Sequence, residues 1–190
     1  MARIAVTEFV SLDGVMEDPG GSEGSKHGAW TFEFNPEEGM QFKFDETMAS
    51  TALLLGRVTY EAFAEAWPSR DGEFADRFNS VPKYVVSSTL ESPTWTNTTV
   101  LKGDAVDEVR RLKREQDGEI VVHGSATLAR ALLGNNLVDE LRLMVYPVVL
   151  GSGKRIFGET SDSKRLRLVE SREVGDGVLL LRYERAEADT

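Results

Sequence analysis

The sequence contains no cysteine and only two histidines, His27 and His123, which lie far apart along the chain. Without cysteine there is no disulfide, no thiolate metal site and no cysteine nucleophile. Two distant histidines do not make a histidine-rich metal site, so we expect no metal. A chain without cysteine fits a reducing compartment, and we expect a cytoplasmic protein.

Positive charge is also scarce. The chain has 22 Lys and Arg residues and 32 Asp and Glu residues, which gives a formal net charge of −10. This balance argues against general binding to nucleic acid or anionic membrane, and we expect neither partner. No apolar run reaches membrane-spanning length, and the opening MARIAVTEF lacks the apolar core of a signal peptide. Because the net charge is negative, any anionic ligand must be held by a local basic pocket.

What is present is an ordinary globular composition of 190 residues, 41% hydrophobic and 28% charged. A chain of this length can bury one substantial core. No internal repeat, low-complexity tract or linker divides it. We therefore expect a single domain over residues 1–190.

Strand-like stretches recur along the chain, and helical patterns separate the earlier ones. The predicted strands cover residues 3–10, 53–55, 83–86, 98–101, 120–122, 138–146, 165–172 and 178–184. The predicted helices run from about residue 36 to 52, 57 to 67, 105 to 117 and 126 to 134, with Asn35 and Asp104 as N-caps of the first and third. Residues 69–80 are charged and predict a loop.

These elements predict an α/β fold. Early strand–helix units give parallel strands, and the sequence 175–177 (Gly-Asp-Gly) between the last two strands predicts an antiparallel hairpin. The expected architecture is a mixed, mainly parallel sheet with helices on its faces.

The central stretch is EIVVHGSATLARALLGN, residues 119–135, in which a buried strand turns at Gly124 into a helix. The start of such a helix exposes unpaired backbone N–H groups and the positive end of the helix dipole, so it suits a phosphate. The alternative is an ordinary strand–helix turn with no ligand.

Two other strand ends offer compatible chemistry. Gly56 begins the sequence GRVT, which adds a guanidinium from Arg57 and a hydroxyl from Thr59, and Ser87 and Ser88 follow the next strand. Ligands in such sheets gather at the carboxyl ends of the strands, and arginine donates two parallel bonds to a phosphate. A ligand with a pyrophosphate and a further ribose phosphate would occupy all three ends. NADPH fits this description.

The ordered motifs SLDG, LLGRVTYE, KYVVSS, VVHGSATL and YPVVLGSGKRIF resemble the dihydrofolate reductase-like superfamily. Within it, the chain resembles the C-terminal reductase domain of the bifunctional riboflavin-biosynthesis deaminase/reductase and its stand-alone bacterial relatives. The resemblance covers residues 3–184. It implies a three-layer dihydrofolate reductase-like fold, the cofactor NADPH and a homodimer.

The resemblance also implies roles for individual residues. Thr59 would meet the pyrophosphate, Arg57 would lie near the adenosine phosphate, and Ser87 and Ser88 would face the 2′-phosphate. The expected cofactor-binding set is Leu12, Gly14, Gly56, Arg57, Thr59, Ser87, Ser88, Gly124, Ser125, Ala126, Thr127, Gly151 and Gly153. In it, residues 124–127 cover the pyrophosphate, Leu12 and Gly14 border the nicotinamide, and the two later glycines lie near substrate and cofactor.

The chain departs from the family pattern in two places. His123 stands where many members have the first glycine of a pair. No motif aligns Glu37 or Glu38 with the acid of true dihydrofolate reductases, and first-turn acids also complement a helix dipole.

The predicted function is an NADPH-dependent reductase that transfers a hydride to a small heterocyclic or carbonyl-like substrate, as in 5-amino-6-(5-phosphoribosylamino)uracil reduction. Asp13 is the candidate proton donor, or a turn residue. Trp30 and Phe32 stack on a flat substrate, or fill the core. Lys154, with Arg155 as its alternative, holds a substrate phosphate, or is solvated. The alternative function is a non-catalytic nucleotide-binding sensor or accessory protein.

Overall fold

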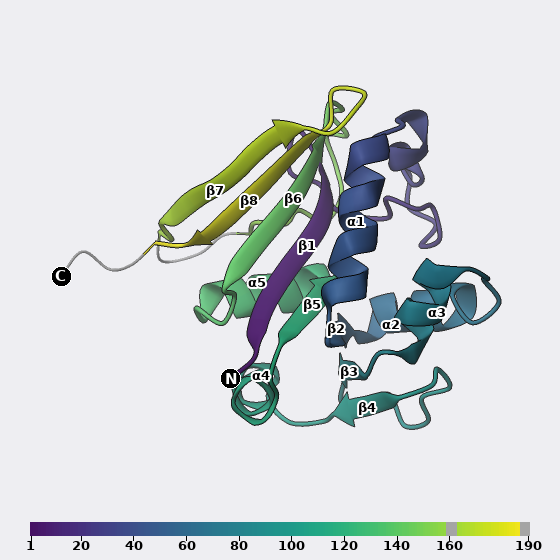
Figure 1. The fold of residues 1–190 in the computed structure, drawn as a ribbon, viewed down its shortest axis with the longest axis vertical. Helices are drawn as coiled ribbons and strands as arrows, with labels where there is room; N and C mark the ends of the chain where they lie inside the picture. The colour runs from purple at the N-terminus through teal and green to yellow at the C-terminus, as the bar shows by residue number, and fades with distance from the viewer. Residues whose placement is uncertain (159–162, 187–190) are drawn as a thin grey trace.

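The computed structural model describes residues 1–158 and 163–186 as a mixed sheet with helices on both faces (Figure 1). Within these residues the sheet has eight strands in the order β4-β3-β2-β5-β1-β6-β8-β7. Their bounds are β1 Arg3–Ser11, β2 Ala52–Gly56, β3 Lys83–Val86, β4 Thr98–Leu101, β5 Glu119–His123, β6 Glu140–Tyr146, β7 Leu166–Glu173 and β8 Leu179–Arg185. Neighbours from β4 to β6 pair in parallel, and β8 pairs antiparallel with β6 and β7. The predicted fold class is confirmed.

The helices form the two outer layers. The described ranges contain α1 Glu37–Ala49, α2 Arg57–Ala66, α3 Glu73–Ser80, α4 Ala105–Glu115, α5 Ala126–Gly134 and a 3-10 helix, η1 Trp30–Glu33. In the part of the chain that the structure describes, none of the helices is long and apolar enough to cross a membrane.

The alternation of side chains along β2 assigns the helices to the two faces. Leu53 packs with Tyr60 of α2 and Phe78 of α3. The next residue, Leu54, belongs to the core that contains Leu132 of α5. Since α1 contacts α3, the helices α1, α2 and α3 cover one face, and α4 and α5 cover the other. Figure 1 shows α1 in front of the sheet and α5 behind it.

The helix α3 corrects the loop that we expected over residues 69–80. Its high charge conceals an apolar stripe, because Phe74 and Phe78 lie four residues apart and reach the same side of the helix. The ring centroid of Phe78 lies 4.7 Å from that of Trp67 and 5.6 Å from that of Phe63, so α3 is held by aromatic packing onto α2.

The start of α1 also differs from the expectation. Asn35 is not its N-cap, because Pro36 occupies that position and no side chain caps the helix. The Asn35 amide donates instead to Glu37 Oε1 at 3.5 Å. By contrast, Asp104 caps α4 as expected, since its carboxylate accepts from the backbone N–H groups of Val106 and Asp107.

Candidate functional site

The three turns that the sequence singled out directly follow β2, β3 and β5, which are neighbouring parallel strands. The register pairs Gly56 of β2 with Val86 of β3, and Leu54 of β2 with Val122 of β5. The turns after β3, β2 and β5 therefore open at one edge of the sheet. Phosphate-binding chemistry from three segments far apart in sequence is brought together at this edge.

Two of these turns are joined directly. The backbone N–H of Gly56 donates to Ser125 Oγ at 2.8 Å, and the backbone N–H of Ser125 donates to Thr59 Oγ1 at 3.0 Å. Thr59 is buried. Its hydroxyl therefore positions the turn after β5, which is a different task from the direct ligand contact that the resemblance implied.

Gly124 is required where it stands. Its φ is +56°, and a Cβ built on it would lie 3.0 Å from Thr59 Oγ1 and 3.1 Å from Thr59 Cγ2. The close approach lets α5 begin against β2. Because α5 begins at Ala126, the N–H groups of Ala126 and Thr127 have no partner inside the helix, and they face the end that attracts anions.

The expected 2′-phosphate residues are present at the edge but already have partners. Arg57 Nη1 contacts both carboxylate oxygens of Glu61, at 3.0 and 2.8 Å, on the half-exposed surface of α2. Ser87 is buried, and its Oγ accepts from the backbone N–H groups of Thr89 and Leu90. Ser88 is exposed. An exposed i,i+4 ion pair contributes only about 0.3–0.5 kcal/mol, so Arg57 can exchange Glu61 for a phosphate at small cost.

Asp13 ties the loop after β1 to the loop after β6. Its carboxylate accepts from Ser11 Oγ at 2.7 Å and from the backbone N–H groups of Leu150 and Gly151 at 3.1 and 2.9 Å. Arg155 lies 3.3 Å away. These hydrogen bonds, that from Ser11 foremost, lower the pKa of Asp13 to about 2. The low pKa favours the ionised form of Asp13, and its expected role as proton donor stays a prediction.

The contact between Asp13 and residues 150 and 151 also brings the other expected loop residues together. Gly14 accepts from the backbone N–H of Ile156, and Leu12 donates its N–H to the carbonyl of Val148. Val15 and Arg155 form a further antiparallel bridge. A Cβ on Gly153 would lie 2.6 Å from Val15 Cγ1. The first and the late glycine loops thus form one unit at the carboxyl ends of β1 and β6.

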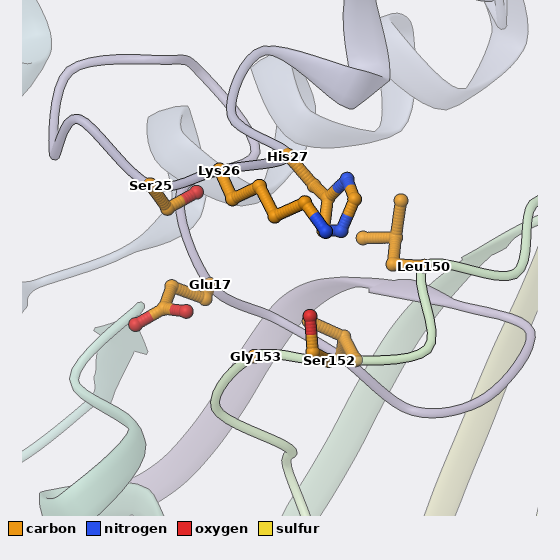
Figure 2. A pocket seen from close by; sticks show the side chains of 8 residues that line it. Glu17, Ser25, Lys26, His27, Leu150, Ser152 and Gly153 are labelled. Carbon is orange, nitrogen blue, oxygen red and sulfur yellow. The ribbon is translucent and has the colours of Figure 1, made fainter.

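A small cavity of about 40 Å³ opens between these loops (Figure 2). Its lining is Val15, Glu17, Ser25, Lys26, His27, Leu150, Ser152 and Gly153. In Figure 2 the side chains of Lys26 and His27 point toward Leu150 and Ser152, whereas the Glu17 carboxylate is turned away. Neither Lys26 nor His27 was expected to line a site, although a lysine and a histidine inside an acidic, glycine-rich segment were a visible signal.

The three residues expected to bind substrate differ in their exposure and in their partners. Lys154 Nζ lies 3.1 Å from Glu17 Oε1 and 3.8 Å from Glu23 Oε2, so its charge is already balanced beside the cavity. Trp30 is 4% exposed and packs edge-on against Tyr146, with ring centroids 5.3 Å apart. It packs in the core of this structure, and its expected stacking on a substrate stays a prediction. Phe32 is 74% exposed.

A carboxyl group that the sequence analysis did not single out lies between β1 and β5. Glu8 is 6% exposed, and its Oε2 accepts from the backbone N–H of Gly124 at 3.0 Å. Within the described residues, Glu8 Oε1 is buried without a hydrogen-bond partner. An acid in the interior of the mainly apolar strand RIAVTEFVS was the signal available in the sequence.

The residues at this edge suit a dinucleotide with several phosphates. The helix start at Ala126, the exchangeable guanidinium of Arg57 and the exposed Ser88 hydroxyl provide anion contacts, and the unpartnered Glu8 Oε1 provides a polar contact at the far end. No group of three or more His, Cys, Asp or Glu residues that could hold a metal ion occurs within residues 1–158 and 163–186.

Comparisons with known proteins agree with this arrangement. The family described as the RibD C-terminal domain matches residues 2–180. The uncharacterized protein YyaP of Bacillus subtilis (strain 168) is 27% identical over 186 residues, 95% of this chain and 94% of its own length.

Two solved structures share the fold. A Shewanella sp. PV-4 protein named for riboflavin biosynthesis is similar with a TM-score of 0.77 and 24% identity, over 98% of this chain and all of that chain. Dihydrofolate reductase from Enterococcus faecalis, complexed with NADP(H), is similar with a TM-score of 0.63 and 17% identity, over 97% of both chains. The chain belongs to the RibD C-terminal domain family.

Proposed function

We propose that this protein is an NADPH-dependent reductase acting on a small heterocyclic or carbonyl-like substrate. The observation that carries the proposal is the meeting of the turns after β3, β2 and β5 at one sheet edge, with the start of α5 among them. Membership of the RibD C-terminal domain family and the NADP(H) in the related dihydrofolate reductase support it.

Each part of the edge has a separate task in this proposal. The first N–H groups of α5 bind the pyrophosphate, and Arg57 with Ser88 binds the 2′-phosphate. Thr59 and Ser125 hold the two turns at the required separation. When bound, the cofactor supplies a hydride, and the protein supplies binding, orientation and exclusion of water.

The two glycine loops serve the substrate. Asp13 fastens them to each other as an ionised carboxylate, so Leu12, Gly14 and Gly151 enclose the reacting end of the site. For a negatively charged substrate group we propose Lys26 and His27, which line the cavity, together with Lys154, which would exchange its half-exposed ion pair with Glu17 for the substrate. Phe32 remains our proposal for stacking on a flat substrate.

Activity is tested by following the absorbance of reduced nicotinamide with a panel of pyrimidine, pterin and quinone-like substrates. Turnover of one class with NADPH, and much less with NADH, supports the proposal. Tight NADPH binding without turnover across the panel would favour a non-catalytic nucleotide-binding protein, which needs the same three turns. Absence of NADPH binding would overturn both.

We also propose that the protein is a cytoplasmic homodimer. Leu166 and Leu168 are substantially exposed on the edge strand β7, and Leu179 is exposed on its neighbour β8. Exposed apolar side chains at a sheet edge favour association. Light scattering during gel filtration tests this, and a monomer at micromolar concentration would contradict it.

A further inference from the structure

Glu8 lies in β1 next to the carboxyl end of β5, the strand from which the chain departs to the opposite face of the sheet. From β1 the chain passes through α1 on one face to β2, whereas from β5 it passes through α5 on the opposite face to β6. The crevice outside the carboxyl ends of β1 and β5 lies between these two departures, and ligands of open α/β sheets bind at such a switch point. The register pairs Thr7 with His123, so Glu8 and Gly124 follow at this crevice.

The carboxyl group of Glu8 is held firmly on one side only. Val6 and Val10, in the same alternating series, pack in the core with Leu128 of α5. Glu8 Oε2 accepts from the N–H of Gly124, whereas Oε1 is buried without a partner among the described residues. Unsatisfied buried polar groups are rare and costly, and in native proteins such a group often has a binding or catalytic role.

The surroundings of Glu8 favour the neutral form of its carboxyl group. Burial raises its pKa well above the usual value, and Glu46 adds to the rise. The ammonium of Lys43 and the hydrogen bond from Gly124 act in the opposite direction but do not outweigh burial. A neutral carboxyl group offers one O–H donor and acceptor oxygens side by side, whereas a carboxylate only accepts.

We propose that Glu8 binds the carboxamide of the cofactor's nicotinamide, an inference that rests on the function proposed above. A carboxylic acid and a primary amide are complementary, because the acid O–H donates to the amide carbonyl and the amide N–H donates to the acid. Oε2 already accepts from Gly124, and Oε1, which has no partner within the described residues, is the oxygen left to pair with the carboxamide.

Adenine also presents a donor beside an acceptor, but the sheet places it elsewhere. Arg57 and Ser88, the proposed 2′-phosphate contacts, follow β2 and β3. From β3 to β1 there are three strand spacings of about 4.8 Å each, so Glu8 lies about 14 Å from the β3 end. An extended dinucleotide with its adenosine phosphate at β2 and β3 presents the nicotinamide to Glu8. Because Oε1 is covered in this structure, residues around it must shift when the ring enters.

The test compares Glu8→Leu with Glu8→Gln by calorimetric titration with NADPH and with adenosine 2′,5′-bisphosphate, which lacks the nicotinamide. We expect Glu8→Leu to weaken NADPH binding about tenfold, as for loss of one buried hydrogen-bonded pair, and to leave binding of the bisphosphate unchanged. Glu8→Gln keeps a donor and an acceptor and retains affinity for NADPH. Thermal unfolding of both variants establishes that they are folded.

The outcomes separate the two proposals. If wild-type protein binds neither ligand, the proposed function fails and this inference with it. If the bisphosphate binds but Glu8→Leu leaves NADPH affinity unchanged, or weakens both ligands equally, the role of Glu8 is overturned and the proposed function stands.

A second measurement does not depend on a variant. An NADP⁺ analogue with an acetyl group in place of the carboxamide should bind wild-type protein about tenfold more weakly than NADP⁺, because it keeps the carbonyl acceptor but has no amide N–H to donate to Glu8. Equal affinity would overturn the inference.

Discussion

Replacing His123 with Phe should remove much of the protein's sensitivity to mild acid. The imidazole lies among the rings of Phe63 and Phe78, with centroids 6.4 and 5.5 Å away, and within the described residues its Nε2 is buried without a partner. Burial lowers the pKa of His123 to about 3, with the charges of Lys43 and Arg142 acting in the same direction and Glu46 against them. The folded protein therefore holds a neutral imidazole.

The magnitude follows from proton linkage. The unfolded chain takes up this proton near pH 6.5 and the folded protein only near pH 3, so the free energy of unfolding decreases as the pH falls between these values. The slope is about 1.4 kcal/mol per pH unit, which amounts to about 2 kcal/mol between pH 6.5 and 5.0. Urea unfolding of wild-type protein and His123→Phe at about pH 7.5 and 5.0 measures the difference between their slopes.

His123→Gln is the matched control, because it does not titrate in this range and has a different shape. We expect both variants to lose about 2 kcal/mol less than wild-type protein on acidification, whatever their stability at the higher pH. Parallel losses in all three proteins would refute the buried, neutral imidazole.

Three further predictions concern the turns and loops of the site. Gly124→Ala should reduce the free energy of unfolding by about 2 kcal/mol through its left-handed φ and the contact with Thr59, and adding Thr59→Ser should recover part of it in urea unfolding. Asp13→Asn should speed amide hydrogen exchange at Leu150 and Gly151, since it weakens two hydrogen bonds; unchanged exchange would contradict the tie between the loops. Glu61→Gln should release Arg57 and strengthen NADPH binding about twofold with no change for NADH, whereas weaker NADPH binding would show that the ion pair orients Arg57 usefully.

The local patterns predicted most of the sheet. β3 and β4 occupy the predicted residues, and the bounds of the other strands differ by one or two positions, because apolar β-branched runs determine where a buried strand lies. The helix α3 was missed because its charges dominate the sequence, while only packing against Trp67 and Phe63 reveals the stripe formed by Phe74 and Phe78.

The site was predicted less completely, for a different reason. Adjacent parallel strands bring the three turns together, as expected for ligand sites at the carboxyl ends of such strands. The partners of individual side chains depend on contacts distant in sequence. Asp13 meets residues 150 and 151, and Lys154 meets Glu17, and neither contact can be read from the residues next to them in the sequence. The position of Glu8 at the site likewise becomes visible only from its hydrogen bond with Gly124, which is distant in sequence.

The most direct test of the account is the affinity of wild-type protein and Arg57→Ala for NADPH and for NADH, which differ only in the 2′-phosphate. If the turns after β2, β3 and β5 form one dinucleotide site, Arg57→Ala weakens NADPH binding by about 1–3 kcal/mol and leaves NADH binding nearly unchanged. Equal weakening of both cofactors, or no effect on either, would contradict it.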